Sequence, residues 1–326
     1  MTAAAHPTRR AALAATLLGI SAGAARAQSF PDRPVRLVIP YSAGGGTDVT
    51  GRELARHMAD DLGQPVVVEN RTGANTAIAA DYVARSRPDG YTLYFAGASS
   101  LVVPPLVSPQ LPIRPADFAP VSLVLKQPYA LGVAPAFADS LGALVARLRA
   151  QPDVHGFGHT GTGGIGHLIG VRLMNATGTR MVSVPYRGFQ QTVLDVISGR
   201  LAMTFEAVAN FLPFLRDGNI RLLAVSSDRR LPQLPDVPTF AEAGYPDMVV
   251  QSWLGVYAPV ATPSPVIARL NQAVARAVGS EGFRTMTAAQ IQQPESSTPE
   301  ALAALTRADI EVWRRVIAPL NLQVNN

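Results

Sequence analysis

The chain of 326 residues contains no cysteine. It therefore has no disulfide, no thiol nucleophile, no cysteine-based metal site and no cysteine that could carry a lipid anchor. Lys126 is the only lysine, and no cluster of basic residues is interleaved with aromatics, so a nucleic-acid partner is not expected. Beyond residue 28 no segment offers about 18 uninterrupted apolar residues, so we expect no membrane span in the mature protein.

Motifs of common enzymes are missing as well. No Gly-Lys-Ser/Thr follows any glycine run, which excludes a P-loop, and no Gly-x-Ser-x-Gly nucleophile turn is present. Ser99 and Ser100 occur without any sequence sign of a partner base. His155, His159 and His167 lie close together, but without a convergent carboxylate we interpret them as histidines bonded to local backbone. We expect no catalysis, no metal and no cofactor.

The N-terminal segment has the features of a secretory signal. Arg9 and Arg10 precede an apolar run of small residues, and Ala-Arg-Ala stands directly before Gln28. This pattern predicts a signal peptide over residues 1–27, cleaved after Ala27, by either the Sec or the twin-arginine route. The segment holds three arginines and no acid, so the net charge of +5 falls to +2 in the mature chain.

Apolar runs at 35–40, 65–70 and 91–96 alternate with helix-like stretches, which indicates βαβ units and a parallel sheet. The first helix should begin with Thr47 or Asp48 as its N-cap. A second α/β series follows from residue 156, and the proline-rich stretch 101–120 reads as irregular. The last helix, near the C-terminus, should bury Leu305, Ala308, Val312 and Val316.

Two long extended segments are each interrupted, one near Gln127 and Pro128 and the other near Gln251 and Ser252. A chain that crosses twice between two lobes would produce this pattern. The length also suits two cores. We therefore expect one discontinuous lobe of residues 28–127 and 253–326, and a second lobe of residues 128–252.

Glycine-rich turns join strand-like runs to helix-like runs at "YSAGGGTD", residues 41–48, and at "GHTGTGGIGH", residues 158–167. A helix N-terminus presents unpaired N–H groups and a positive dipole end, and glycine lets an anion approach the backbone. The alternative is that the glycines only permit the turns. A third such turn at residues 73–76 makes an anion site the stronger interpretation.

The segment "GTGGIG", residues 161–166, also matches the dinucleotide-binding pattern G-x-G-x-x-G. The next strand, "MVSVPY", ends without the acidic residue that would bind a ribose hydroxyl, although Arg187 could meet a 2′-phosphate. An exported NADP-dependent oxidoreductase is therefore an alternative function.

Many ordered segments resemble one family across nearly the whole mature chain. They include "PYSAGGGTD", "LGQPVVVENRTGA", "RPDGYTL", "FGHTGTGGIGHL", "VPYRG", "PDVPTFAEAGYP" and "SWLGVYAP". In these the chain resembles the extracytoplasmic solute receptors of tripartite tricarboxylate transporters, also called Bug proteins. The resemblance implies an α/β type II periplasmic binding fold with two lobes joined by two crossing segments.

The same resemblance implies a ligand site between the lobes, in which backbone donors and bridging waters hold a carboxylate. Its residues would be Tyr41, Gly44, Gly45, Gly46, Thr47, Asp48, Ala74, Asn75 and Ser99 from one lobe and Thr160, Gly161 and Glu206 from the other. The chain departs from the family at Gly164 and Ile165, where a hydroxyl residue is usual, at Asn75 and Thr76, where glycines are usual, and at Glu206, where many members have Asp.

The expected function is that of a monomeric periplasmic solute-binding protein without catalysis. It would close on a small carboxylate, such as a dicarboxylate, an amino acid or an aromatic acid, and present it to membrane permease subunits. An orphan sensor that reports its ligand to a signalling partner is a further alternative.

Overall fold

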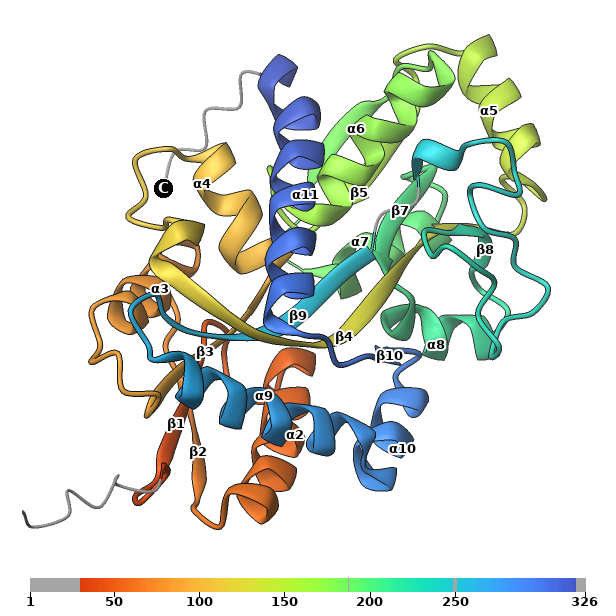
Figure 1. Cartoon of the computed structure of the whole chain (residues 1–326). Helices are drawn as coiled ribbons and strands as arrows, with labels where there is room; N and C mark the ends of the chain where they lie inside the picture. The colour runs from red at the N-terminus through yellow and green to blue at the C-terminus, as the bar shows by residue number, and fades with distance from the viewer. Residues whose placement is uncertain (1–29, 187, 249–250, 321–326) are drawn as a thin grey trace, which may run out of the picture.

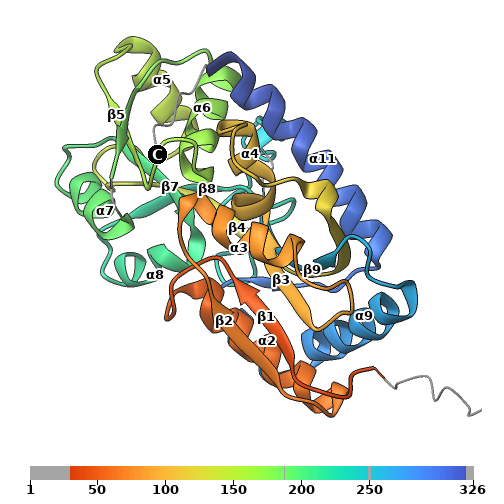
Figure 2. The ribbon, with the colours of Figure 1, turned by 90° about the vertical axis from the view of Figure 1, so that its left-hand side faces the viewer.

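The structure is a computed structural model that describes residues 30–186, 188–248 and 251–320. The predicted signal peptide and Arg187 lie outside these residues. The described strands form a mixed ten-stranded sheet whose main path runs β2-β1-β3-β9-β4-β7-β5-β6, with β8 and β10 each paired to β4. Figures 1 and 2 show helices on both sides of this sheet.

The first half is a parallel α/β unit. Strands β1 (Val35–Ile39), β2 (Val66–Asn70) and β3 (Thr92–Gly97) pair in parallel, as the alternating pattern predicted. Helix α2 (Gly46–Leu62) connects the first two strands and buries Leu54 and Met58 in the core. Its N-cap is Gly45, two or three residues earlier than predicted, so that Thr47 and Asp48 lie within the first turn.

The rest of this half consists of short helical segments that follow β2 and β3. These are the 3₁₀ turn η1 (Ala74–Thr76), helix α3 (Ala77–Ala84), the π-helical turn η2 (Ala98–Val102), helix α4 (Val103–Val107) and the 3₁₀ turn η3 (Pro115–Asp117). The expectation of an irregular stretch at 101–120 is therefore wrong in part. Pro104 and Pro105 stand in the first turn of α4, where the missing N–H groups would have no partner in the helix.

The second half repeats the α/β pattern. Strand β5 pairs in parallel with β6 and β7, and β7 and β8 are antiparallel to the end of β4. Its elements are α5 (Leu141–Ala150), β5 (Gly156–His159), α6 (Ile165–Thr177), β6 (Val182–Pro185), α7 (Phe189–Ile197), β7 (Met203–Ala207), α8 (Val208–Arg216), β8 (Arg221–Val225) and the 3₁₀ turn η4 (Pro246–Met248).

Strand β4 (Phe118–Val133) joins the halves. From Phe118 to Pro128 it pairs antiparallel with β9 (Gln251–Pro259), and from Tyr129 to Val133 it pairs with β7 and β8. It changes partners where an interruption was predicted, between Pro128 and Tyr129. In Figure 1 both β4 and β9 run through the centre of the molecule, between the orange strands and the green ones. The predicted lobe boundaries follow the same division but stay a prediction.

The C-terminal part is helical and contains α9 (Ser264–Gly279), α10 (Glu281–Ala289), the short strand β10 (Gln293–Pro294), α11 (Pro299–Ile317) and η5 (Ala318–Leu320). Helix α9 packs on α2 and β4, whereas α11 packs on β4, α4 and α6 and so contacts both halves (Figure 2). Of the four residues predicted for the buried face of α11, Val316 is buried, Leu305 and Val312 are partly buried and Ala308 is exposed, so the prediction is right in part. The buried residues of α11 are Leu302, Thr306, Trp313, Val316 and Ile317.

Within the described residues no helix combines the length and the apolar character needed to cross a membrane.

The pairing of β3 with β9 generates a stability prediction. A Cβ at Gly97 would overlap the carbonyl oxygen of Trp253, whereas a Cβ at Gly142 in α5 would meet nothing within 4 Å. Gly97→Ala should therefore force the two strands apart and lower the free energy of unfolding by about 2 kcal/mol or more. Gly142→Ala is the control and should leave it unchanged or raise it by about 0.5 kcal/mol. Urea denaturation of both variants checks this, and equal midpoints would contradict it.

Candidate functional site

The first glycine turn, between β1 and α2, is organised around a buried carboxylate. Asp48 is only 2% exposed, and its Oδ2 accepts hydrogen bonds from the Gly44 N–H and from Arg52 Nε, each at 2.9 Å. Its Oδ1 accepts from Asn70 Nδ2 at 2.8 Å. The bond from Arg52 is the main cause that lowers the pKa of Asp48 to about 2, and the bonds from Gly44 and Asn70 add to it. Asp48 is thus an internal anion that holds the turn in shape.

Tyr41 connects this turn to the end of β3. Its hydroxyl lies 3.0 Å from Ser99 Oγ, and its carbonyl oxygen accepts a hydrogen bond from Asn70 Nδ2 at 2.9 Å. Burial raises the pKa of the Tyr41 phenol, so the group is neutral and keeps its hydrogen-bonding proton. Tyr41 and Ser99, which were both predicted for the site, are therefore brought together.

The third turn contains three consecutive residues with positive φ. Ala74, Asn75 and Thr76 have φ of 45°, 47° and 74°, a conformation that is costly for residues other than glycine. Thr76 Oγ1 donates to the Ser100 carbonyl oxygen at 3.0 Å and helps to hold this shape. The turn places Asn75 against a cavity that also borders Ser99.

The second glycine turn leads from β5 into α6. The N-caps of α6 and α2 have almost the same backbone conformation, with φ −72° and ψ 164° at Gly164 and φ −75° and ψ 165° at Gly45. Neither glycine offers a side-chain cap. The first turn of α2 contains Asp48, but the first turn of α6 contains no acidic residue. The positive end of α6 is therefore available to an external anion.

Both halves line one cavity of about 140 Å³. Asn75 and Ser99 come from the first half, and Thr160 and Gly161 come from the second, so four of the predicted residues meet there. The lining also includes Thr162, Gly163, Gly164 and Ile165 of the second glycine turn. Val103, Pro104 and Val107 of α4 line it as well, and the sequence did not indicate them because the proline-rich stretch showed no period.

The other predicted site residues do not line this cavity. They are Tyr41, Gly44, Gly45, Gly46, Thr47, Asp48, Ala74 and Glu206. Tyr41 touches the lining residue Ser99, and Ala74 precedes the lining residue Asn75. Gly44 connects to Tyr41 through Asp48 and Asn70. These four residues are thus joined by hydrogen bonds next to the first-half lining residue Ser99.

Glu206 lies at the end of β7, opposite Ala130 of β4. Its Oε1 accepts a hydrogen bond from the Ala207 N–H at 2.8 Å, and the ion pairs found among the described residues do not include it. Desolvation raises the pKa of Glu206 to about 7, against the opposing effect of bonds from Ala207 and Asn210. Burial thus favours the neutral form of the Glu206 carboxyl far more than it would for an exposed glutamate.

Tyr129, another residue that the sequence did not single out, connects Glu206 to the first half. Burial is the main cause that raises its pKa, and the nearby groups of Glu206 and Tyr41 raise it further. Tyr129 is also the first residue of β4 to pair with the second half. The Tyr129 hydroxyl thus lies near enough to Glu206 and to Tyr41 to be influenced by both.

The histidines are explained by local hydrogen bonds. Nδ1 of His159 accepts from the Gly161 N–H at 3.3 Å, and Nδ1 of His167 accepts from the Gly163 N–H at 3.2 Å. The interpretation as histidines bonded to turn backbone is confirmed for these two. Among the described residues no group of three or more His, Cys, Asp or Glu could hold a metal ion.

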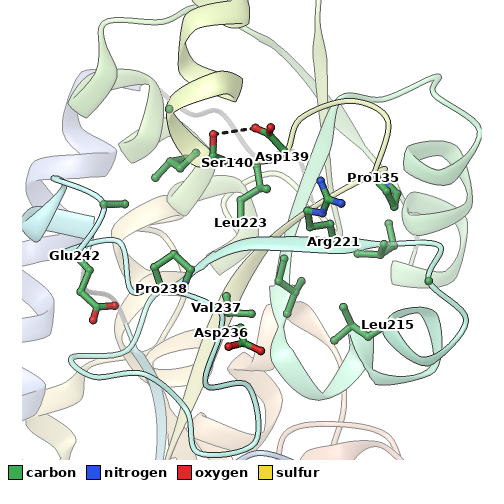
Figure 3. A pocket seen from close by; sticks show the side chains of 16 residues that line it. Pro135, Asp139, Ser140, Leu215, Arg221, Leu223, Asp236, Val237, Pro238 and Glu242 are labelled. Carbon is green, nitrogen blue, oxygen red and sulfur yellow. Dashed lines mark hydrogen bonds between the residues drawn. The ribbon is translucent and has the colours of Figure 1, made fainter.

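A larger pocket of about 750 Å³ lies elsewhere, between the start of α5, the end of α8 and strand β8 (Figure 3). Its polar side chains include Arg221, Asp139 and Asp236, and none of the predicted site residues lines it. It belongs to the second half alone. We therefore take the smaller cavity, which both halves line, as the candidate site.

Two α/β halves joined by β4 and β9, with glycine turns meeting at one cavity, define a substrate-binding receptor of the periplasmic type and not an enzyme. Residues 50–322 match the family described as "Tripartite tricarboxylate transporter family receptor", and the chain belongs to this family. The G-x-G-x-x-G segment is accordingly a turn of a receptor, and the oxidoreductase alternative is set aside.

Relatives match the chain over most of their length. Protein BugT of Bordetella pertussis is 37% identical over 294 residues, which cover 89% of this chain and 90% of BugT. MatC of Rhodopseudomonas palustris, solved with bound malate, is 31% identical with a TM-score of 0.74 and covers 88% of this chain and 100% of its own. Rpa4515 of R. palustris, solved with adipate, is 33% identical with a TM-score of 0.77, covering 88% and 97%.

The buried carboxylate of Asp48 generates a prediction on pH dependence. Its pKa falls from the ordinary 3.8 to about 2 in the folded state, so the ionised group stabilises the fold above about pH 4 and this contribution is lost as the pH falls toward 2. Asp48→Asn should lower the free energy of unfolding by about 1 to 2 kcal/mol at pH 7, and by progressively less below pH 4. Chemical denaturation across this range measures the difference.

Asp60→Asn, on an exposed position of the same helix, is the control for Asp48→Asn and should change stability by less than about 0.5 kcal/mol at any pH. A constant penalty for Asp48→Asn from pH 7 to pH 3 would show that its charge is not the stabilising feature.

Proposed function

We propose that this receptor captures a small organic carboxylate in the cavity between its two halves and presents it to the membrane permease subunits of a tripartite transporter. The observation that carries the proposal is the cavity itself, to which the first half contributes Asn75 and Ser99 and the second half the acid-free N-terminus of α6. A carboxylate there would accept backbone N–H bonds at a positive dipole end. The malate bound by MatC and the adipate bound by Rpa4515 support this ligand class.

The proposed cycle uses the predicted lobes, residues 28–127 with 253–326 and residues 128–252. Their relative rotation would take place where β4 changes partners, between Pro128 and Tyr129. The cavity is small, so a ligand that contacts both linings would draw the lobes together. The proposed working form is a monomer in the periplasm, exported by a signal peptide that is removed after Ala27.

In this proposal Glu206 selects among carboxylates. With a pKa near 7, it can take up a proton when a second negative charge approaches, or lose one when an ammonium group approaches. No arginine pairs with it among the ion pairs described above, so the ligand itself decides its charge. A dicarboxylate would favour the protonated acid, whereas an amino acid would favour the carboxylate.

The anion site is tested by titration calorimetry with malate and adipate, each compared with its diamide. An amide has the same shape but lacks the charge that strengthens hydrogen bonds to backbone N–H groups. We expect each acid to bind more tightly than its diamide by about 1.5 to 3 kcal/mol, a factor of more than ten in Kd. Equal affinity for acid and amide would overturn the carboxylate proposal.

The role of Glu206 is tested by the pH dependence of binding. A dicarboxylate that raises the pKa of Glu206 binds with proton uptake, so its affinity should increase up to about tenfold between pH 8 and pH 6. In Glu206→Gln this dependence should vanish and affinity at pH 8 should match or exceed that of the wild type. An amino-acid ligand should show the opposite slope and lose affinity in the variant. The exposed Glu311→Gln is the control, and an identical profile in all three proteins would remove Glu206 from the site.

A further inference from the structure

His159 and His167 form a buried pair directly beneath the second glycine turn. They are 1% and 5% exposed, their ring centroids are 4.5 Å apart, and the ring of His167 stacks on that of Phe157 at an interplanar angle of 10°. Neither histidine lines the cavity, but the turn between them, residues 160–164, does. The pair therefore underlies the part of the second half that faces the ligand.

The hydrogen bonds determine the protonation state of both rings. A backbone N–H can only donate, so Nδ1 of each imidazole must be the bare, accepting nitrogen when it pairs with Gly161 or Gly163. The proton of the neutral ring then sits on Nε2, and in His159 it is available to Ser183 Oγ at 2.8 Å. If Nδ1 also gained a proton, it would face the N–H of the turn as a second donor, and the hydrogen bond would be lost.

Glycine makes the turn depend on these bonds. Gly161 and Gly163 have φ of 134° and 80°, a backbone conformation that residues other than glycine rarely adopt. No side chain caps the N-terminus of α6. The N–H of Gly163 is held from below by His167, and a Cβ at Gly163 would press on Val107 of α4 in the opposite half. The turn is thus held between the histidine pair and the first half.

We propose that His159 and His167 are positioning residues for the ligand-binding turn, and that proton uptake by this pair releases the turn and lowers ligand affinity. The inference rests on the proposed function, since it assigns the regulation of the same cavity. The first glycine turn would not be released in this way, because it is held by the carboxylate of Asp48.

The electrostatic surroundings agree with this assignment. Burial is the main cause that lowers the pKa of both rings, and the neighbouring His159 contributes to bringing the pKa of His167 to about 4. Charged groups on α6 and on the elements packed against this region have other partners. Arg172 interacts with Asp247 and Asp309, Glu206 with Ala207 and Asn210, and Asp195 with Tyr186 and Arg200.

The experiment uses mature protein labelled with ¹⁵N-glycine and compares His167→Asn with His167→Phe. Asparagine places its Oδ1 as many bonds from Cα as Nδ1 of histidine, so it can accept from Gly163 but cannot titrate. Phenylalanine keeps the aromatic packing on Phe157 and removes the acceptor. His155→Asn, at a histidine bonded to Gln151 outside the turn, is the matched control.

At pH 7 the amide exchange of Gly163 should accelerate about three- to tenfold in His167→Phe, the effect of losing one ordinary hydrogen bond. It should stay near the wild-type rate in His167→Asn and in the control. Between pH 7 and pH 4 the Gly163 signal should shift in the wild type and in the control but not in His167→Asn. An unprotected Gly163 amide in the wild type, or the same pH response in His167→Asn, would overturn the proposal. If His167→Phe does not fold, the comparison with His167→Asn still decides.

A second measurement uses malate and adipate as probes. Their affinity for the wild type should decrease toward pH 4 more steeply than their affinity for His167→Asn. Protonation of the ligand itself affects both measurements equally. Parallel profiles would show that the turn is not released in acid. Failure of both acids to bind would count against the proposed ligand class, while the exchange measurement, which needs no ligand, would still decide the role of the histidines.

Discussion

The pairing of β4 with two different sets of strands is the constraint on which the rest of the structure depends. Its first part pairs with β9, and its last five residues pair with β7 and β8, so that one sheet extends through both halves. Backbone hydrogen bonds on both sides of Pro128 leave little freedom except at the change of partners. Tyr129 follows directly and lies near both Tyr41 and Glu206, so groups from both halves meet at the segment that joins them.

The two principal glycine turns solve the same geometric problem with different charges. In each turn a glycine is the N-cap of the helix that follows, with nearly identical backbone angles. One helix end is neutralised by its own Asp48, which fixes the turn in shape, and the other has no such group. The turn before α6 lines the cavity and can accept an anion, whereas the turn before α2 is held by its own carboxylate.

Buried polar side chains around the cavity mostly form hydrogen bonds to the backbone, and few of them form ion pairs. Four of these side chains bond to main-chain atoms, namely those of Asn70, Thr76, His159 and His167. The Tyr41 hydroxyl bonds to the side chain of Ser99. Such contacts fix where N–H groups point, which matters for a ligand recognised by the main chain. They also explain why pKa values near the cavity depart from ordinary ones, since burial without a counter-charge favours the neutral form of Glu206, His159 and His167.

The sequence by itself determined the alternation of strands and helices, both glycine turns and the change of partner near Pro128, because these follow from local periodicity and backbone stereochemistry. The resemblance to solute receptors indicated which turns face each other. Only the tertiary structure decided that Trp313 and Thr306 are on the buried face of α11, that α4 lines the cavity and that Asn70 bonds to Asp48. These features depend on contacts between segments far apart in the chain, where packing and desolvation override the local pattern.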